Sequence, residues 1–324
     1  MGGNSPRVCI VCPAPAGTRL GNRITALRWQ AILKSLGCRP HIVVGDAFNP
    51  DDHHDLVIAL HAKRNAAAIA AARASGASVP IVLAITGTDL YRDGKSPRTK
   101  RSIEIADRIV VLQPEAGKRI PKHHQKKVRV IYQSVTASRY PRALKPRQLR
   151  VIVAGHLRRE KDPLRAAFAM RRLPAESRIV VRHYGGVLDA ALGDKAVDES
   201  RRNCRYEYRG ECTRSHVRRE LARSWMMVIS SRLEGGANVL SEAIVDHLPV
   251  LASRIDGNIG LLGEDYSGYF RVGDTHELRR LLIECEMNSD FIVHLKQQVL
   301  QRAPLFHPDH EHRCWANLLK ELDL

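Results

Sequence analysis

The sequence predicts an α/β protein with two doubly wound domains that face a central cleft. Short apolar runs alternate with helical patterns along almost the whole chain, which is the order of elements that gives parallel sheets with right-handed crossovers. The chain has 324 residues, about the length of two ordinary domains. Of these residues 44% are apolar, so each domain can bury a core of its own.

The first half contains apolar runs that predict strands, each bounded by Gly, Pro or charged residues. These runs lie at residues 7–11, 40–44, 55–60, 80–85, 108–112 and 128–132. Residues 21–37 read as a helix that ends at Gly37. The residues expected on one face of this helix are Ile24, Leu27, Ala31 and Leu36.

The alternation breaks at residues 136–148, a stretch with Pro and Arg that is read as a linker. It then restarts, with apolar runs at residues 149–154, 178–184, 204–210, 225–230 and 248–253. Ligands of doubly wound folds bind at the carboxyl ends of the strands. The active site is therefore expected between the two domains.

The chain is strongly basic, with 52 Lys and Arg against 34 Asp and Glu. Nucleic-acid binding is one interpretation, because basic surfaces neutralise phosphates. The densest clusters, residues 121–129 and 140–150, lie near the linker and lack interleaved aromatic residues for base stacking. A generally basic surface, or a cleft that attracts a small anion, fits the spread of charge better.

The seven cysteines are scattered, so reduced thiols in a cytoplasmic protein are expected. Cys9 and Cys12 form a CxxC inside an apparent buried strand, where redox or zinc chemistry is not expected. The clusters DDHHD (51–55) and HPDHEH (307–312) read as the solvated starts of a strand and a helix. With no DxD motif, no metal site is expected. No signal peptide or membrane span is evident either.

Two loops of the first half are candidates for anion recognition. Residues 17–23 follow the first strand and open a helix, and they combine flexible backbone with cationic side chains. Residues 85–93 close the fourth strand with hydroxyls, a glycine and a carboxylate. Ordinary alternatives are solvated arginines at a turn and an Asp helix cap. The candidate residues are Gly17, Arg19, Gly21, Asn22, Arg23, Thr86, Gly87, Thr88 and Asp89.

Two segments of the second half suit a nucleoside diphosphate sugar. In AGHLRREKDP (154–163), His156, Arg158 and Lys161 could reach a pyrophosphate. In RLEGGANVLSEAI (232–244), two glutamates flank a stretch of small residues before a helix. A carboxylate accepts two hydrogen bonds from a diol, and a helix N-terminus favours negative charge. Solvated glutamates on a surface helix are the alternative.

In this arrangement Glu234 would bind the sugar hydroxyls and Glu242 the ribose diol. The diphosphate would lie over the glycines, and Asn238 would cap the helix. The expected donor-binding residues are His156, Glu234, Gly235, Gly236, Ala237, Asn238, Val239 and Glu242.

These segments resemble a known family. EGGANVLSE (234–242) is similar to the E-x7-E signature of family-4 glycosyltransferases, and AGHLRREKDP to their diphosphate loop. The resemblance implies the GT-B fold, with two Rossmann-like domains and no metal or other cofactor. It implies that residues 1–140 bind the acceptor and residues 141–307 bind the nucleotide sugar. A last helix, at about 308–324, would pack back on the first domain.

A narrower resemblance, to selenosugar synthases of selenoneine biosynthesis, rests on six segments in order. They are residues 13–29, 59–68, 86–93, 111–114, 130–134 and 154–163. It implies a reaction between a UDP-sugar, UDP-GlcNAc or UDP-glucose, and selenophosphate. The 1-selenosugar product would pass to the next enzyme of that pathway. Neither nucleic acid nor stable membrane association is implied.

Two residues depart from the broader family pattern. His156 stands where many members carry Arg, and Thr86 where several carry His. A sugar hydroxyl commonly needs a base, whereas selenophosphate is already anionic and instead needs cations. His61 and Lys63 join Arg19 and Arg23 as candidate acceptor residues. Catalysis is assigned to Lys161, Arg158 and Glu234, of which the two cations stabilise the leaving group.

Two other functions remain open from the sequence. One is an ordinary family-4 glycosyltransferase that acts on a glycan or lipid hydroxyl. Such enzymes often carry a basic and apolar membrane-docking helix, which is not clear in this sequence. The other is a non-catalytic protein that binds nucleic acid or another anion.

Overall fold

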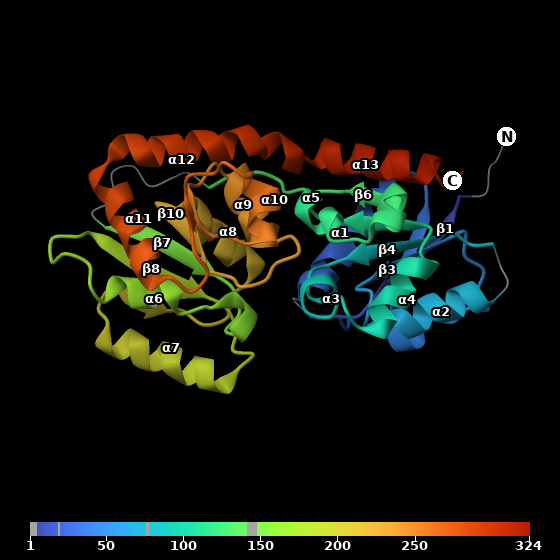
Figure 1. Cartoon of the computed structure of the whole chain (residues 1–324), viewed down its shortest axis with the longest axis horizontal. Helices are drawn as coiled ribbons and strands as arrows, with labels where there is room; N and C mark the ends of the chain where they lie inside the picture. Colours follow the sequence, from blue (N-terminus) through green and yellow to red (C-terminus); the bar gives the residue numbers. More distant parts are fainter. Residues whose placement is uncertain (1–4, 19, 76–77, 141–147) are drawn as a thin grey trace. The chain divides into compact units, whose positions relative to one another are not determined.

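The computed structural model describes residues 5–18, 20–75, 78–140 and 148–324. The chain divides into two compact units, Met1–Ser134 with Pro308–Leu324, and Val135–His307. Each unit is built on a six-stranded parallel sheet with helices around it (Figure 1). The predicted α/β class with two doubly wound sheets is confirmed. The chain leaves the first unit after Ser134, before the expected linker.

The first sheet has the strand order β2-β1-β3-β4-β5-β6. Its strands are β1 Arg7–Cys12, β2 Arg39–Val44, β3 Leu56–Leu60, β4 Ile81–Ile85, β5 Arg108–Val111 and β6 Val128–Val130. Its helices are α1 Gly21–Ser35, η1 Gly45–Ala47, α2 Ala66–Ala74, α3 Thr88–Tyr91, α4 Pro97–Ile105, α5 Pro114–Lys118, η2 Lys122–Lys127 and α13 Pro308–Lys320.

Helices cover both faces of this sheet, and the strand residues alternate between two cores. Val8 and Ile10 of β1 pack with α1 and α13 in one core. Cys9 and Val11 pack with α2, α4 and α5 in the other core. The inner strands β1, β3 and β4 are therefore continuous apolar runs, because both of their faces are covered.

The second sheet has the order β12-β11-β10-β7-β8-β9. Its strands are β7 Leu149–Ala154, β8 Ile179–Tyr184, β9 Tyr206–Tyr208, β10 Met226–Ile229, β11 Val250–Ser253 and β12 Tyr269–Phe270. Its helices are η3 Arg159–Lys161, α6 Arg165–Met170, α7 Ala190–Arg202, α8 Arg214–Ala222, α9 Asn238–Val245, α10 Asp256–Leu262, α11 Thr275–Met287, α12 Ser289–Arg302 and η4 Ala303–Phe306. The two-residue β12 has no counterpart among the predicted strands.

The helix α1 begins where the sequence predicted it, but its expected face is wrong. Leu27 is 48% exposed and Ala31 is exposed. The buried residues lie on another face of the helix, at Thr25, Ala26, Trp29 and Leu33. Trp29 determines which face of α1 is buried. Its large ring is fully buried against Trp315 of α13, with the ring centroids 4.8 Å apart.

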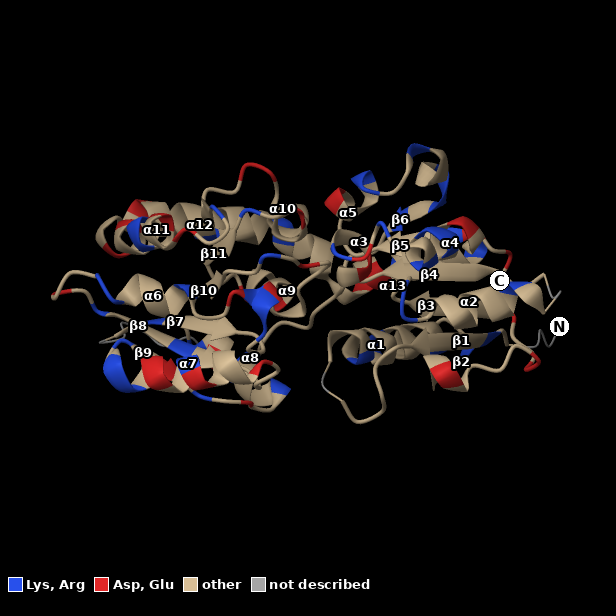
Figure 2. Ribbon diagram, turned by 60° about the horizontal axis from the view of Figure 1, so that its bottom comes forward, with Lys and Arg blue, Asp and Glu red and all other residues tan. Residues whose placement is uncertain are grey.

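Basic residues occur among acidic residues over both units, and they form no single stripe along the part of the chain that is drawn in colour (Figure 2). Many acidic side chains pair with Arg, as Glu321 does with Arg108 and Arg129. Among the described residues, no helix is both long enough and apolar enough to cross a membrane.

A buried carboxylate joins α13 to the rest of the first unit. Glu311 is fully buried, and its Oε1 accepts a hydrogen bond from the indole nitrogen of Trp29 at 2.8 Å. Its Oε2 accepts from the backbone N–H of Ser134 at 2.7 Å. The interpretation of residues 307–312 as a solvated helix start is therefore wrong at Glu311. The amphipathic α13 turns this acidic residue toward the core.

We expect Glu311→Ala to lower the free energy of unfolding by about 2–6 kcal/mol, because it leaves two buried N–H donors unpaired at about 1–3 kcal/mol each. Urea unfolding followed by tryptophan fluorescence measures the change, since Trp29 reports directly on this contact. The matched control is Glu104→Ala, at an exposed carboxylate of α4. Equal losses in the two variants would contradict a special role for Glu311.

Candidate functional site

The strand order reverses once in each sheet, and the site residues cluster at these two points. In the second unit the neighbours β7 and β10 are not consecutive in the chain, and strands are added outward on both sides of them. The loops that follow these two strands leave a crevice at the carboxyl end of the sheet. They carry two of the predicted segments, 154–163 and 232–244.

The structure joins these two segments through an ion pair. Lys161 Nζ lies 2.5 Å from Oε1 of Glu234, and both side chains are mostly buried, with 18% and 7% of their surfaces exposed. The hydroxyl of Ser231 donates a hydrogen bond to the same oxygen. Two residues 73 positions apart are therefore held as one polar group. Ser231 was missed from the sequence because a serine at a strand end has no distinctive pattern.

Two glycines outside the predicted motifs shape the backbone of this group. A Cβ on Gly257, in α10, would lie 2.3 Å from the carbonyl oxygen of Glu234. A Cβ on Gly185, after β8, would lie 2.0 Å from the carbonyl oxygen of Gly155. Both distances are far below van der Waals contact, so only glycine lets these segments support the Glu234 and Gly155 loops.

Two histidines support the loop after β7. His183 is completely buried in β8, and its Nε2 donates to the carbonyl of Gly155 at 3.0 Å. Its Nδ1 must then accept from the hydroxyl of Tyr206, 2.9 Å away. His156 Nδ1 accepts from the N–H of Gly186 at 3.1 Å, which leaves its Nε2 as the N–H donor of the neutral ring. Burial lowers the pKa of both histidines, that of His183 to about 4.

The loop that carries Lys161 also carries Arg158, three residues earlier. Nε of Arg158 is buried and has no hydrogen-bond partner among the described residues, which is unusual because buried donors are normally paired. Lys161, Gly155, Ser230 and Ser231 line a small cavity at this point. An anionic group within reach of Arg158 could accept a hydrogen bond from this Nε.

Glu242, the second glutamate, and the helix α9 that carries it differ in part from the prediction. Glu242 is 5% exposed, and its Oε1 accepts from Nε and Nη2 of Arg214 at 3.1 and 2.8 Å. Asn238 was expected to cap the helix, but it is the first residue of α9. Ala237 occupies the N-cap position, and no side chain caps the helix there. Gly235 and Ala237 are buried, and Gly236 and Val239 are half-buried.

In the first unit, the carboxylate of Asp89 binds backbone groups of two neighbouring loops. Asp89 is fully buried. Its carboxylate accepts from the backbone N–H groups of Ala62 at 3.0 Å, Thr86 at 3.1 Å and Gly87 at 2.7 Å. These bonds join the ends of β3 and β4. The expected ligand contact at Asp89 is therefore replaced by a positioning role.

His61 follows β3 with a positive φ of 76°, which non-glycine residues rarely adopt. Its Nδ1 accepts from the N–H of Arg64 at 3.2 Å, so its Nε2 donates to the hydroxyl of Thr88 at 3.0 Å. Burial lowers the pKa of this ring, which favours the neutral form. Backbone strain of this kind tends to occur at functional sites.

The cationic side chains predicted to bind the acceptor differ in their surroundings in the first unit. Lys63 Nζ pairs with Asp93 at 2.8 Å. Arg23 and Asn22 lie half-buried in the first turn of α1, after an exposed turn in which Gly17 has a φ of 78°. Arg19 lies outside the described residues.

The CxxC is buried as predicted. Cys9 and Cys12 are both fully buried in β1, and burial raises the pKa of both thiols, that of Cys9 to about 12. Neither thiol is therefore suited to redox exchange with a partner in solvent.

The family described as "Glycosyl transferases group 1" matches residues 136–298, half of the chain. A comparison with curated protein sequences finds no significant match. The structure is similar to sucrose-phosphate synthase from Thermosynechococcus elongatus, with a TM-score of 0.80 and 14% identity over 98% of this chain and 99% of that one. It is also similar to HepE of Anabaena in complex with UDP and glucose, with a TM-score of 0.72 and 14% identity over 98% and 100%.

The pneumococcal O-GlcNAc transferase GtfA, in complex with UDP and GlcNAc, is a further neighbour. Its TM-score is 0.63 and its identity 16%, over 82% of this chain and 56% of that chain. At these identities the likenesses concern the fold, and the GT-B architecture predicted from the sequence is confirmed.

The buried His183 predicts a pH effect on stability. Its pKa is about 4 in the folded protein against about 6.5 when it is exposed, so the unfolded chain binds more protons between these values. Stability is therefore full above pH 6.5 and falls by at most about 3 kcal/mol as the pH drops to 4. In His183→Gln, whose amide can still donate to Gly155, urea unfolding should show a shallower fall over this range. An equally steep fall would assign the effect to other groups.

The Lys161–Glu234 pair should show strong coupling. Lys161→Met leaves a buried carboxylate and Glu234→Gln a buried ammonium, and breaking a buried pair costs about 3–5 kcal/mol. The double variant should therefore lose much less stability than the sum of the single variants. Urea unfolding of the four proteins gives this cycle, with Lys195→Met, at an exposed lysine of α7, as the control. Additive losses would mean that the pair is not coupled in solution.

Proposed function

The chain belongs to the glycosyl transferases group 1 family, and we propose that it joins a UDP-sugar to selenophosphate to form a 1-selenosugar. UDP-GlcNAc is the favoured donor, ahead of UDP-glucose. The observation that carries the glycosyl transfer is the buried Lys161–Glu234 pair at the strand reversal of the second sheet, in a loop that also holds Arg158 with its unpartnered Nε. The six sequence segments 13–29, 59–68, 86–93, 111–114, 130–134 and 154–163 support the acceptor.

The proposed donor site uses the charges of the second unit. Lys161 and Arg158 neutralise the diphosphate as it leaves, together with the backbone N–H groups before α9. Glu234 accepts from the sugar hydroxyls. Both hydrogen bonds from Arg214 go to Oε1 of Glu242, which leaves Oε2 for the ribose. HepE, which binds UDP and glucose, and GtfA, which binds UDP and GlcNAc, support a donor of this class.

The proposed acceptor site is on the first unit. Arg23 lies in the first turn of α1, and a guanidinium can bind a phosphoryl group through two N–H donors. Thr86 and Thr88 can each offer a hydroxyl, with the Thr88 side chain already oriented by His61. Arg19 and Lys63 are proposed to add positive charge, and Gly17, Asn22 and Gly87 to shape the loops.

In the proposed reaction, selenium attacks the anomeric carbon of the sugar. One carbon–selenium bond forms as the carbon–oxygen bond to the diphosphate breaks, and UDP leaves. The phosphoryl group stays on selenium until water removes it as phosphate. No base is required, because the selenium carries its negative charge before the attack. The resulting selenosugar would be the substrate of the next selenoneine enzyme.

The donor prediction is tested by mass spectrometry of UDP-GlcNAc and selenophosphate with and without the enzyme. We expect a selenosugar mass and one UDP per turnover. Turnover should be complete in EDTA, because Lys161 and Arg158 neutralise the diphosphate charge that a metal would otherwise neutralise.

Lys161→Ala should lower kcat/KM at least a hundredfold, and Lys195→Ala should leave it unchanged. Turnover that needs magnesium or manganese would contradict the metal-free donor site. Transfer to a sugar or lipid hydroxyl alone would replace selenophosphate as the acceptor.

The acceptor prediction uses Arg23. Arg23→Ala should raise the KM for selenophosphate about tenfold to a hundredfold, since a charge-assisted hydrogen bond contributes about 1.5–3 kcal/mol. The KM for UDP-GlcNAc should not change. The control is Lys34→Ala in the last turn of the same helix, and inorganic phosphate should compete with selenophosphate. If phosphate does not compete and the variant keeps its acceptor KM, this loop is not the acceptor site.

A further inference from the structure

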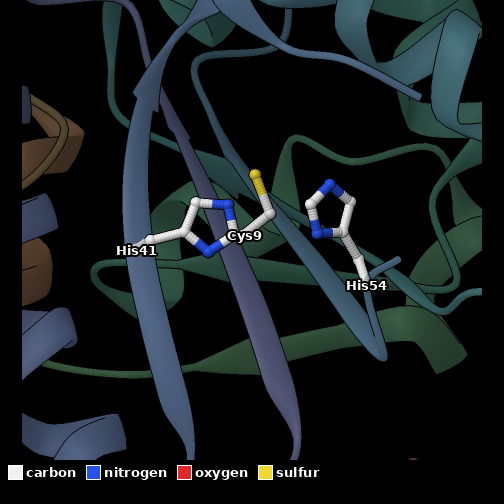
Figure 3. Close-up of side chains that lie close together, drawn as sticks. All are labelled: Cys9, His41 and His54. Carbon is white, nitrogen blue, oxygen red and sulfur yellow. The ribbon is translucent and has the colours of Figure 1, made fainter. Parts of the chain in front are cut away.

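A cluster of possible metal ligands lies in the first unit, away from the residues used above. Cys9 in β1 is directly opposite His41 in the neighbouring β2, and His54 lies in the segment that leads into β3. One ligand atom from each of the three side chains lies within 4.8 Å of the others. Figure 3 shows both imidazole rings turned toward the sulfur of Cys9 from either side.

His54 is buried without a hydrogen-bond partner among the described residues, as expected for a side chain that binds a ligand. His54 is only 7% exposed, so the expectation that residues 51–55 form a solvated strand start is wrong at this position. Neither ring nitrogen has a hydrogen-bond partner among the described residues. A buried polar group without a partner costs about 1–3 kcal/mol. Its ring is held between those of His41 and Phe48, with centroids 5.3 and 5.8 Å away, so it is fixed in place without a polar contact.

We propose that Cys9, His41 and His54 bind a zinc ion. One thiolate and two imidazoles are a usual zinc donor set, and bonds of about 2.0–2.3 Å require ligand atoms roughly 3.5 Å apart. The observed separations, of up to 4.8 Å, need to close by up to about 1.3 Å, which His41 can provide because it is exposed on the edge strand. A water molecule or the carboxylate of Asp52, whose charge acts on Cys9, would complete the tetrahedron.

The remaining nitrogen of His54 has a suitable second contact. The backbone of Asn49 lies near this ring, although no contact in the structure meets hydrogen-bond geometry. Histidines that bind metals usually donate their other N–H to a backbone carbonyl or a carboxylate. A small rotation of the ring onto zinc would bring His54 into that arrangement.

The position of the cluster separates it from the proposed reaction. Cys9 lies in the first half of β1 and His54 just before β3, so the cluster is toward the amino ends of the strands. The acceptor loops follow the carboxyl ends of the same strands. A cavity of about 660 Å³, lined in part by Asp52, His54, Val79 and Leu324, gives an ion a path to the ring of His54. The zinc would therefore link β1, β2 and the segment that leads into β3. It would take no part in turnover.

The test is titration of chelator-treated, full-length protein with Co²⁺, followed by competition with Zn²⁺. We expect one equivalent of Co²⁺ to give a thiolate-to-cobalt charge-transfer band, which Zn²⁺ then abolishes. Zn²⁺ should also raise the Tm. His41→Gln, at an exposed position that leaves the core intact, should weaken binding at least about tenfold. Cys9→Ser should remove the band and His54→Gln should remove the Tm shift.

Matched controls are close in the sequence. His53→Gln changes the adjacent exposed histidine, and Cys12→Ser changes the buried thiol at the other end of β1. Both variants should keep the band and the Tm shift. Absence of a stoichiometric band in the wild type would overturn the proposal. So would a band that persists in Cys9→Ser, or binding that His53→Gln weakens as much as His41→Gln does.

Discussion

The order in which each parallel sheet is assembled determines where this protein can do chemistry. In both units the first strand lies inside the sheet, and later strands are added on both sides of it. The connections from the two central strands therefore leave toward opposite faces, and a crevice remains between them at the carboxyl end. The Glu234 and Lys161 segments follow the central strands β10 and β7. The loops of His61 and of Gly17 follow the central strands β3 and β1 of the other sheet.

Buried polar side chains then fix these loops. Asp89 ties the ends of β3 and β4 through three backbone N–H groups. His183 ties β8 to the Gly155 loop, and Glu234 ties its own loop to Lys161. Each of these groups is costly to bury and becomes favourable only when its partners are in place. A site built in this way is rigid before its ligand arrives, which reduces the ordering cost of binding.

The strands could be predicted from the sequence, and so could the two segments that the Lys161–Glu234 pair brings together, because apolar runs and glycine-rich turns are local signals. The phase of α1 could not, because Trp29 is buried by Trp315, almost 300 positions away. Gly257 and Gly185 gave no sign of their role, since a glycine that admits a neighbouring carbonyl resembles any other glycine. His54 and Glu311 lie in polar clusters that suggest solvent, and only the tertiary fold shows that each is buried. The short β12 has too few residues for a periodic pattern.

The tie between Glu311 and Trp29 has a consequence for how the chain matures during synthesis. The first unit lacks α13 until the ribosome has made the whole of the second unit, because residues 135–307 come between its two parts. Until then α1 packs on β1 and β2, but the indole of Trp29 lacks the ring of Trp315 and the carboxylate of Glu311. The second unit, which is continuous in sequence, can complete its fold first, which reverses the usual order in which domains emerge and fold. The first unit would thus close this part of its core only at the end of synthesis.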